Sequence, residues 1–274
     1  MIDKFDYAEP KCPLSSGKDF YYPDKDAPSG RIPVGRIISK VDSLFNKNDY
    51  AEAGRLLNFW KKEAIDLKDK NGQLAIENEL IGFYRKQHQK EDGLQCIKSA
   101  LELVEALNQG DLASGATVFI NCATAYKEFD MSEQSLPLYT RAEQIYNDTI
   151  EKWDSRFGGL YNNMALTLVD LGEFERAEQA YNNALEVMKR APRGELECAI
   201  TYINMAHMFE QTGELEKIWE CMEKGKQLLQ KQGLLHDGYY AFVIEKCAPS
   251  FEYFGDKATC DQFKKEAAEI YARA

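Results

Sequence analysis

The sequence predicts an all-α fold made of stacked helix pairs, and two observations lead to this prediction. In residues 158–188, apolar residues recur at spacings of three and four on both sides of one interruption at Gly172. Such spacing is typical of one face of an α-helix, and glycine ends a helix at little cost in the left-handed conformation. The same pattern then returns five more times along the chain. The sequence therefore predicts a solenoid of about six helix pairs.

The repeats are in register when each is aligned on one position in the middle of its first helix. These positions are Val41, Ile81, Ala123, Ala165, Ala206 and Ala248, separated by 40, 42, 42, 41 and 42 residues. The turn between the two helices of each pair then falls at Asn48, His88, Asp130, Gly172, Gly213 and Gly255. This period is longer than the roughly 34 residues of a minimal two-helix repeat. We therefore expect longer helices, by about two turns in each pair.

Three features depart from the regular pattern. Trp60 replaces the small residue of the second helix in the first repeat, and terminal repeats often depart in this way because they act as caps. Pro249 lies inside the first helix of the last repeat, where a proline is expected to kink or shorten the helix. Gly72, Gly158 and Gly159 are interpreted as glycines of loops between helices.

Residues 1–33 differ from the predicted six-repeat solenoid of residues 34–274. They contain five of the eight prolines of the chain and show no helical period. Proline at this density favours extended and turn conformations, but the segment has more aromatic residues than a free linker usually carries. The sequence leaves two interpretations, a disordered tail and an extended N-terminal arm packed on the solenoid. A packed arm would cover the hydrophobic end of the first repeat or lie in the groove as a built-in ligand.

The repeat around Ala165 has the clearest set of motif residues. Its first helix reads Tyr-x-x-Met-Ala-x-x-Leu from Tyr161, its turn is Leu-Gly, and its second helix carries Ala177, Tyr181 and Ala184. This pattern resembles the tetratricopeptide repeat (TPR). The resemblance implies a right-handed α–α superhelix, a TPR solenoid, in which the first helices line a concave groove. One departure is that the proline expected after the second helix comes a few residues late, at Pro192.

The long form of the repeat is similar to that of two particular groups of repeat proteins. Residues 161–165 read Tyr-Asn-Asn-Met-Ala, and residues 172–178 read Gly-Glu-Phe-Glu-Arg-Ala-Glu. These stretches are similar to the repeats of kinesin light chains and of bacterial peptide-sensing regulators of the Rap type. The resemblance covers residues 34–274 and concerns the architecture, so neither family's partner follows from it.

Composition limits the partners and the compartment. The formal net charge is −11, whereas proteins that bind phosphate backbones or anionic membranes need a basic surface. The seven cysteines form no CxxC pair, the N-terminus lacks the pattern of a signal peptide, and no run of about twenty apolar residues occurs. We therefore expect a cytoplasmic protein with reduced thiols that binds neither nucleic acid nor membrane.

The candidate ligand contacts are asparagines of the first helices. Asn121, Asn163 and Asn204 occupy one equivalent position in three successive repeats, and Asn162 stands beside the second of them. An asparagine amide both donates to and accepts from a peptide backbone without regard to sequence. A row of three could hold an extended peptide in the groove, while neighbouring pockets set the specificity. The alternative is that each asparagine bonds to the adjacent helix of its own solenoid.

Charged residues on the same predicted face form a second candidate set. Arg85, Lys86 and Lys127 would make a basic patch between the second and third repeats, suited to an acidic side chain or a C-terminal carboxylate. Ordinary solvated charge is the alternative and the favoured interpretation for these three residues. His207 is expected on the groove face of the fifth repeat.

The chain lacks recognisable catalytic motifs. It contains no HExxH, GxSxG, GxxxxGK[ST] or GxGxxG sequence, and its three histidines are far apart in the repeat pattern. The sequence therefore predicts no catalytic residue, no metal site and no cofactor. The leading hypothesis is a non-catalytic scaffold that binds a peptide or protein segment in its groove. A Rap-type peptide-sensing regulator is one alternative, an enzyme with a site assembled across repeats is another, and the oligomeric state is not predicted.

Overall fold

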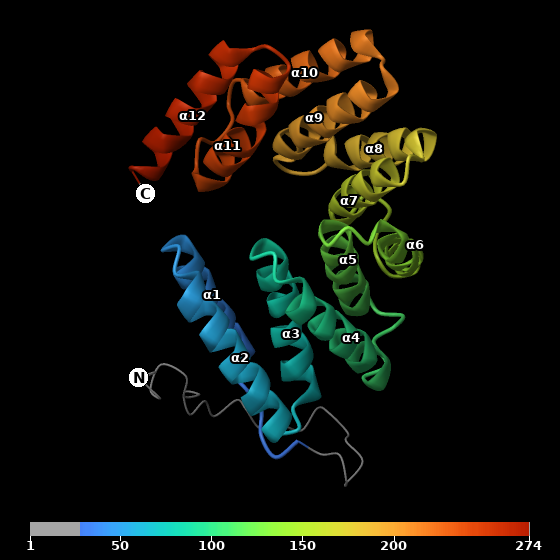
Figure 1. Cartoon of the computed structure of the whole chain (residues 1–274), viewed down its shortest axis with the longest axis vertical. Coiled ribbons are helices and arrows are strands. Elements are labelled where there is room, and N and C mark those ends of the chain that lie inside the picture. The colour runs from blue at the N-terminus through green and yellow to red at the C-terminus, as the bar shows by residue number, and fades with distance from the viewer. Residues whose placement is uncertain (1–27, 274) are drawn as a thin grey trace. The chain divides into compact units, whose positions relative to one another are not determined.

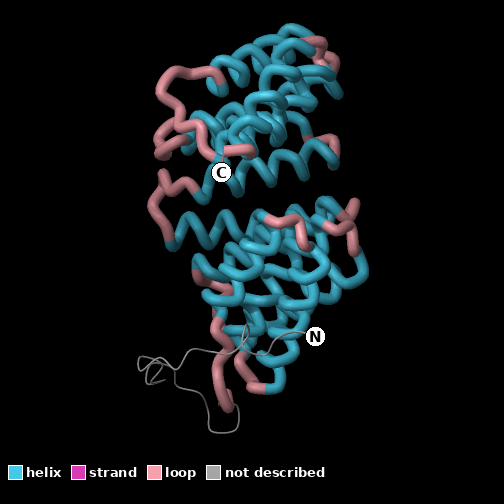
Figure 2. The backbone as a smooth tube through the Cα atoms, turned by 90° about the vertical axis from the view of Figure 1, so that its left-hand side faces the viewer, coloured by secondary structure: helices cyan, strands magenta, loops and turns pink. Residues whose placement is uncertain are grey.

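The computed structural model describes residues 28–273, and this part of the chain is helical without any β-strand (Figures 1 and 2). The all-α prediction is confirmed. The helices are α1 (Val34–Asn46), α2 (Tyr50–Asp66), α3 (Lys70–Lys86), α4 (Lys90–Ala106), α5 (Ala113–Glu128), α6 (Ser132–Thr149), α7 (Arg156–Asp170), α8 (Phe174–Met188), α9 (Gly194–Thr212), α10 (Leu215–Leu229), α11 (Gly238–Tyr253) and α12 (Lys257–Tyr271). Odd-numbered helices are the first helices of the repeats, and even-numbered helices are the second helices.

The chain divides into two compact units, Met1–Ile145 and Tyr146–Ala274, called unit 1 and unit 2. Within unit 1, first helices of neighbouring repeats contact each other, α1 with α3 and α3 with α5. Within unit 2, α7 contacts α9 and α9 contacts α11 in the same way. The second helices α2, α4 and α8 each pack against the first helix that follows them. Each unit therefore has a layer of first helices beside a layer of second helices.

The positions used to align the repeats lie in the cores of the two units. All six are 0% exposed: Val41, Ile81, Ala123, Ala165, Ala206 and Ala248. Alanine at four of them allows helix axes to approach closely, because the side chain extends no further than Cβ. Trp60, the bulky departure in the first repeat, is also buried. The register predicted from the sequence is therefore the register of the structure.

The turns inside the helix pairs also fall where the sequence places them. All six predicted turn residues have left-handed φ angles: Asn48 58°, His88 54°, Asp130 59°, Gly172 72°, Gly213 77° and Gly255 93°. The backbone N–H of the residue after the turn position donates to a carbonyl of the preceding helix. In the fourth repeat, for example, Glu173 N donates to Leu168 O at 2.9 Å. This geometry satisfies carbonyls that the end of a helix leaves unpaired.

Aspartates fix the starts of several helices. The side chains of Asp49, Asp69 and Asp256 each accept a hydrogen bond from the backbone N–H three residues later. Asp237 accepts from both Tyr239 N and Tyr240 N. Such N-caps satisfy donors that have no partner inside the helix.

The glycines interpreted as loop residues lie inside helices instead, and at two of the three positions a close contact leaves no room for a Cβ. Gly158 is in the first turn of α7, and a Cβ built on it would lie 2.2 Å from Cε of Met188. Gly72 is in the first turn of α3, where a Cβ would lie 2.3 Å from Oδ2 of Asp69. Gly159 is also in α7 but faces open space.

Pro249 does not shorten its helix, so this part of the prediction is wrong. The helix α11 continues past Pro249 to Tyr253 and contains 16 residues, as many as α5. Pro249 is exposed. Proline has no N–H to donate to the carbonyl four residues earlier in the helix. Because this side of the helix is exposed, water can solvate that carbonyl instead.

The last residues of the predicted arm contact the first helix pairs. Ser29 N donates to Leu67 O at 2.9 Å, and Ile32 N donates to Oδ2 of Asp69 at 3.0 Å. The side chain of Ile32 is 5% exposed. Residues 28–33 therefore pack on the connection between α2 and α3, while the interpretations that concern residues 1–27 lie outside the described residues.

Candidate functional site

In unit 1, the predicted asparagine pairs with its neighbour on the preceding first helix. Nδ2 of Asn121 on α5 donates to Oδ1 of Asn78 on α3 at 2.9 Å. Both side chains are half-buried, so the amides lie at the surface of the first-helix layer. The bond uses one of the two N–H donors of Asn121.

Unit 2 repeats this bond in the equivalent place. Nδ2 of Asn204 on α9 donates to Oδ1 of Asn162 on α7 at 3.2 Å. In both units the donor stands two residues before the aligned core position, and the acceptor stands three residues before it in the preceding repeat. Asn163 lies next to Asn162 on α7 and is half-exposed. The asparagines thus link adjacent first helices while part of each amide remains at the surface.

The three predicted basic residues have different surroundings. Nζ of Lys86 lies 5.6 Å from the ring centroid of Phe45, and Nζ of Lys127 lies 3.7 Å from Oε1 of Glu128. Arg85 lies close enough to Tyr139 of α6 to affect its hydroxyl. Burial raises the pKa of Tyr139, and the positive charge of Arg85 opposes that rise. Each basic side chain thus has a nearby partner: an aromatic ring for Lys86, a carboxylate for Lys127 and a phenol for Arg85.

His207 lies at the seam between α9 and α11 in unit 2. Its Nε2 is 2.9 Å from Oγ of Ser250, and its ring centroid lies 5.7 Å from that of Tyr253 and 4.9 Å from that of Phe254. Burial lowers the pKa of His207, although the carboxylate of Glu210 opposes this effect. The imidazole is therefore a half-buried part of an aromatic cluster in which burial favours its neutral form.

The sequence prediction missed the aromatic residues of α11. Tyr239 is 39% exposed, Phe242 53% and Tyr253 64%, although all three are large rings. The hydroxyls of Tyr239 and Tyr253 donate to Glu197 and Glu210 of α9. Each pair links positions 42 or 43 residues apart, which is one repeat period. That shared spacing was the available signal, but the sequence alone does not reveal which rings remain exposed.

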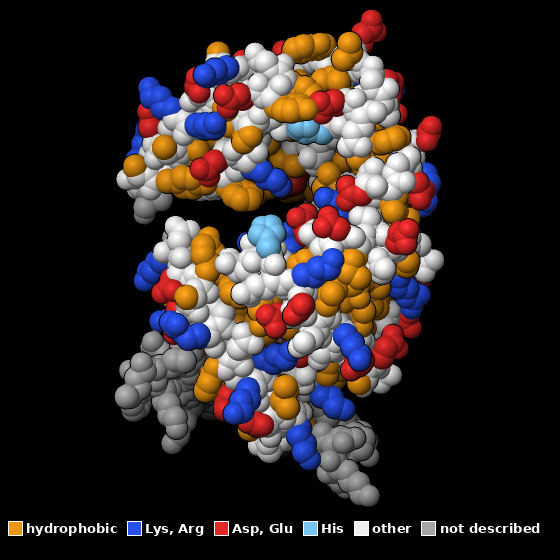
Figure 3. Space-filling view, viewed as in Figure 1, with side chains coloured by type: hydrophobic (Ala, Val, Ile, Leu, Met, Phe, Trp, Pro, Cys, Tyr) orange, Lys and Arg blue, Asp and Glu red, His pale blue; other side chains and the backbone are white. Residues whose placement is uncertain are grey.

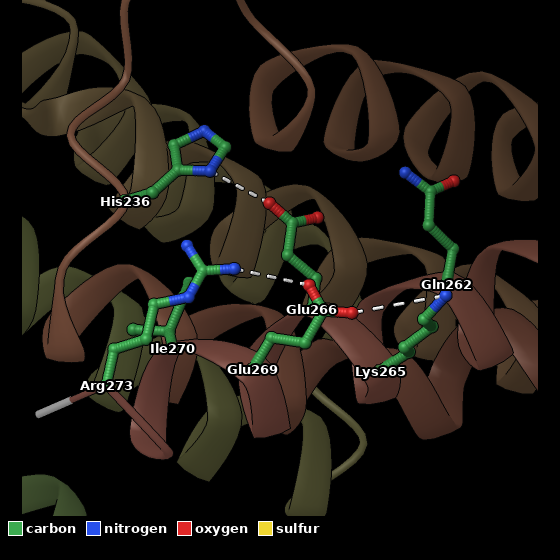
Figure 4. Close-up of a pocket in the computed structure, with 7 residues that line it drawn as sticks. All are labelled: His236, Gln262, Lys265, Glu266, Glu269, Ile270 and Arg273. Carbon is green, nitrogen blue, oxygen red and sulfur yellow. Dashed lines mark ion pairs between the residues drawn. The ribbon is translucent and has the colours of Figure 1, made fainter.

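Unit 2 has two cavities that are lined by residues of its second helices. A cavity of about 410 Å³ separates α8 from α10 and has Met205 and Phe209 of α9 among its lining residues. A second, of about 360 Å³, lies beside α12 and is closed on one side by His236 (Figure 4). There His236 Nδ1 is 2.9 Å from Oε1 of Glu266, and a guanidinium nitrogen of Arg273 is 3.5 Å from Oε2 of Glu269. The ionic groups of this second cavity therefore largely compensate one another.

Charges of both signs are interspersed over the face shown in Figure 3. Across residues 28–273, no three His, Cys, Asp or Glu side chains are grouped so that they could hold a metal ion. The six described cysteines are buried, and burial raises the pKa of Cys122 and that of Cys247 to about 12. These thiols are therefore poor nucleophiles at neutral pH. Within the same residues, every helix is too short or too polar to cross a membrane.

The comparisons with known proteins agree with this architecture. Residues 157–231 match the family model of the tetratricopeptide repeat. Among solved structures, BtubC (BKLC) from P. vanneervenii is 19% identical, with 83% of this chain and 91% of that chain covered and a TM-score of 0.53. No curated protein sequence matches the chain.

Two further structures carry the same fold. NprR in complex with its cognate peptide NprX is 16% identical, with 86% of this chain and 66% of that chain covered and a TM-score of 0.56. A Podosopora anserina protein named after kinesin light chain, with nearly identical TPR-like repeats, is 12% identical, with 73% and 96% covered and a TM-score of 0.54. The chain therefore has the fold of tetratricopeptide-repeat proteins, and its residues 157–231 match the model of that family.

Proposed function

We propose that the protein is a non-catalytic interaction module that binds an extended peptide or protein segment on its first-helix layer. The observation that carries this proposal is the half-exposed asparagines of the first helices, namely the pairs of α3–α5 and α7–α9 and Asn163 beside the second pair. An amide has two donors and one acceptor oxygen, and the bonds between helices use only part of this capacity. The remaining N–H and C=O groups can bond to a peptide backbone.

NprR supports this proposal, because that neighbour was solved with its cognate peptide. In unit 1, Arg85, Lys86 and Lys127 would add contacts to acidic groups of a ligand, and in unit 2 His207 would line the binding face. The proposal requires no metal or cofactor, and with a net charge of −11 it does not include nucleic acid or an anionic membrane as partner. The cytoplasm is the proposed location.

The test begins with selection from a random library of 12-residue peptides displayed on phage, using the full chain as bait. Asn163→Ala is expected to lower the affinity for the selected peptides about fivefold to tenfold, because the variant loses a hydrogen bond worth about 1 kcal/mol. Fluorescence anisotropy with the synthetic peptides measures the change. Asn182→Ala is the matched control, because Asn182 is an exposed asparagine of the second helix α8. Failure to select any peptide, or equal affinities for both variants, would contradict the proposal.

The second candidate is a peptide-sensing regulator, and the match to NprR favours it. Such a regulator changes conformation when its peptide binds, whereas a passive module binds without a change in shape. Small-angle scattering of the chain with and without a selected peptide separates the two functions. A change in the radius of gyration beyond the added mass of the peptide supports the regulator.

A further inference from the structure

The seam between α9 and α11 contains two similar pairs of tyrosine and glutamate. Tyr239 donates to Glu197 near one end of α11, and Tyr253 donates to Glu210 near the other end. Each pair joins one ring of α11 to one carboxylate of α9. A carboxylate has about four acceptor sites, so each glutamate retains acceptors after bonding to its tyrosine.

The chain itself shows what one of these tyrosine rings can bind. The guanidinium carbon of Arg193 lies 5.5 Å from the ring centroid of Tyr239. The same guanidinium makes two hydrogen bonds, of 2.9 and 3.0 Å, to the carboxylate of Asp237. A guanidinium over an aromatic ring and against a carboxylate combines a cation–π contact with charge-assisted hydrogen bonds. The ring of Tyr239 thus already carries a cation from within the chain, and the carboxylate partner of that cation is Asp237.

The other pair has the same parts and an open ring. Tyr253 is 64% exposed, and its neighbours His207 and Phe254 lie at centroid distances of 5.7 and 5.0 Å. Nδ1 of His207 lies 3.9 Å from Oε2 of Glu210, and burial lowers the pKa of His207 and so disfavours a positive charge beside that carboxylate. The hydroxyl contact and the two neighbouring rings hold the Tyr253 ring in place. An oriented aromatic side chain loses little entropy when a ligand binds to it.

The remaining exposed residues of α11 define the rest of this surface. Phe242 is 53% exposed and lies on the same side of the helix as Tyr253, eleven residues earlier. At 1.5 Å per residue the two rings stand about 16 Å apart along the axis, which an extended peptide spans with about five residues. Glu245 and Lys246 lie exposed between them and contribute one charge of each sign. The carboxylate of Glu210 therefore gives the Tyr253 end its acidic character.

We propose that this face of α11 binds a peptide segment with an arginine or lysine on Tyr253 and Glu210. An apolar side chain about five residues away in the peptide packs on Phe242. This inference rests on the proposed peptide-binding function and adds the chemical class of the ligand. Arg193, which lies over Tyr239 and bonds to Asp237, is the internal example of a cation held between a ring and a carboxylate; in the proposed contact Glu210 supplies the carboxylate.

The test uses the same 12-residue library with the full chain and its variants. Peptides selected by the unchanged chain are expected to share a basic residue about five positions from an apolar residue. Glu210→Gln is expected to lower their affinity at least tenfold and to abolish the preference for a basic residue. Glu210→Lys is expected to select acidic residues at the same position. Glu216→Gln, a loss of one exposed carboxylate on α10, is the matched control and should leave affinity within twofold.

Two tyrosine variants separate the contact from a general loss of folding. Tyr253→Phe keeps the ring and its two aromatic neighbours; it removes one contact that orients the ring but also releases Glu210 from its hydroxyl partner, so affinity is expected to stay within about twofold. Tyr253→Ala removes the ring and should lower affinity at least fivefold, with circular dichroism confirming that helix content is retained. Selected peptides without a basic residue, or affinities that do not respond to Glu210→Gln, would overturn this inference while leaving the proposed function standing. A library that yields no peptide would overturn the proposed function itself.

Discussion

Glu77 is a completely buried carboxylate at a position that is apolar or aromatic in the other repeats. It is 0% exposed, whereas its equivalents, four residues before each aligned core position, are Ile37, Phe119, Tyr161, Tyr202 and Ile244. Its Oε1 accepts from Gln73 and Ser99, both at 2.9 Å, and lies 3.3 Å from Nζ of Lys61. Its Oε2 has no hydrogen-bond partner among the described residues. A buried charge of this kind is tolerated only while its partners remain in place.

The cluster around Glu77 leads to a prediction about stability, because the equivalent positions of unit 2 show which uncharged residues the fold accepts there. The positions equivalent to Lys61 and Glu77 are Leu185 and Tyr202 in unit 2. Lys61→Leu alone should lower the free energy of unfolding by about 3 kcal/mol, because it leaves the carboxylate of Glu77 buried and unpaired. Lys61→Leu combined with Glu77→Tyr should recover most of that loss. Urea denaturation followed by circular dichroism measures both, and an equally unstable double variant would show that the charge is not the cause.

At the scale of single residues, sequence reasoning located backbone positions better than it located contacts. Asn121 and Asn204 occupy the same position of their repeats, and both bond to the preceding first helix. The contacts of Tyr239 and Tyr253 depend on the angle at which α9 and α11 cross. That angle results from the packing of many buried side chains, so a single repeat pattern does not encode it.

At the scale of the helix, α12 shows how one side chain defines an element. Asp256 accepts from the backbone N–H of Thr259 at 3.1 Å and lies 2.7 Å from Nζ of Lys226 on α10. The hydrogen bond from Lys226 is the largest effect, and it lowers the pKa of Asp256 from 3.8 to about 2. The same carboxylate thus starts the last helix and ties it to the preceding second helix.

Asp256→Ala should therefore lower the free energy of unfolding by about 1 kcal/mol, the usual effect of losing an N-cap. Because the folded pKa lies below the unfolded value of 3.8, the contribution of Asp256 is complete above that pH and is lost as pH falls toward 2. The difference between the two proteins should accordingly shrink between pH 4 and pH 2, as followed by thermal unfolding. Asp261→Ala, at an exposed position inside α12, is the control and should show no such convergence.

Helix ends were the most predictable elements, and glycines the least. Turn residues at a fixed repeat position need a left-handed backbone, and the sequence shows this through glycine, asparagine and aspartate. His88 adopts the same conformation at φ 54°, so the repeat register predicted it better than its residue type did. Gly158 was misread because its role is to admit Met188, a contact between distant residues that leaves no local signal.

At the scale of the whole molecule, net charge is the property that the sequence determines completely. A chain of charge −11 attracts cationic peptides over distances of about one Debye length, roughly 8–10 Å at physiological salt. For a selected peptide with one or more basic residues, affinity should fall when NaCl rises from 50 to 500 mM, mainly through slower association. Stopped-flow anisotropy measures the rates. Affinity that is insensitive to salt would show that the contact on unit 2 is apolar and that the acidic surface plays no part.

The buried cysteines allow local unfolding to be measured in each unit. Cys96 and Cys122 lie in unit 1, and Cys198, Cys221, Cys247 and Cys260 lie in unit 2, all within the helix cores. A thiol reagent reaches such a side chain only when the surrounding helices separate, so each labelling rate reports one local unfolding equilibrium. With Cys12 replaced by serine, mass spectrometry of the labelled peptides would rank the repeats by how often they open. A bound ligand would slow labelling most in the repeats that it contacts, and the cysteines would thereby map its site without a structure of the complex.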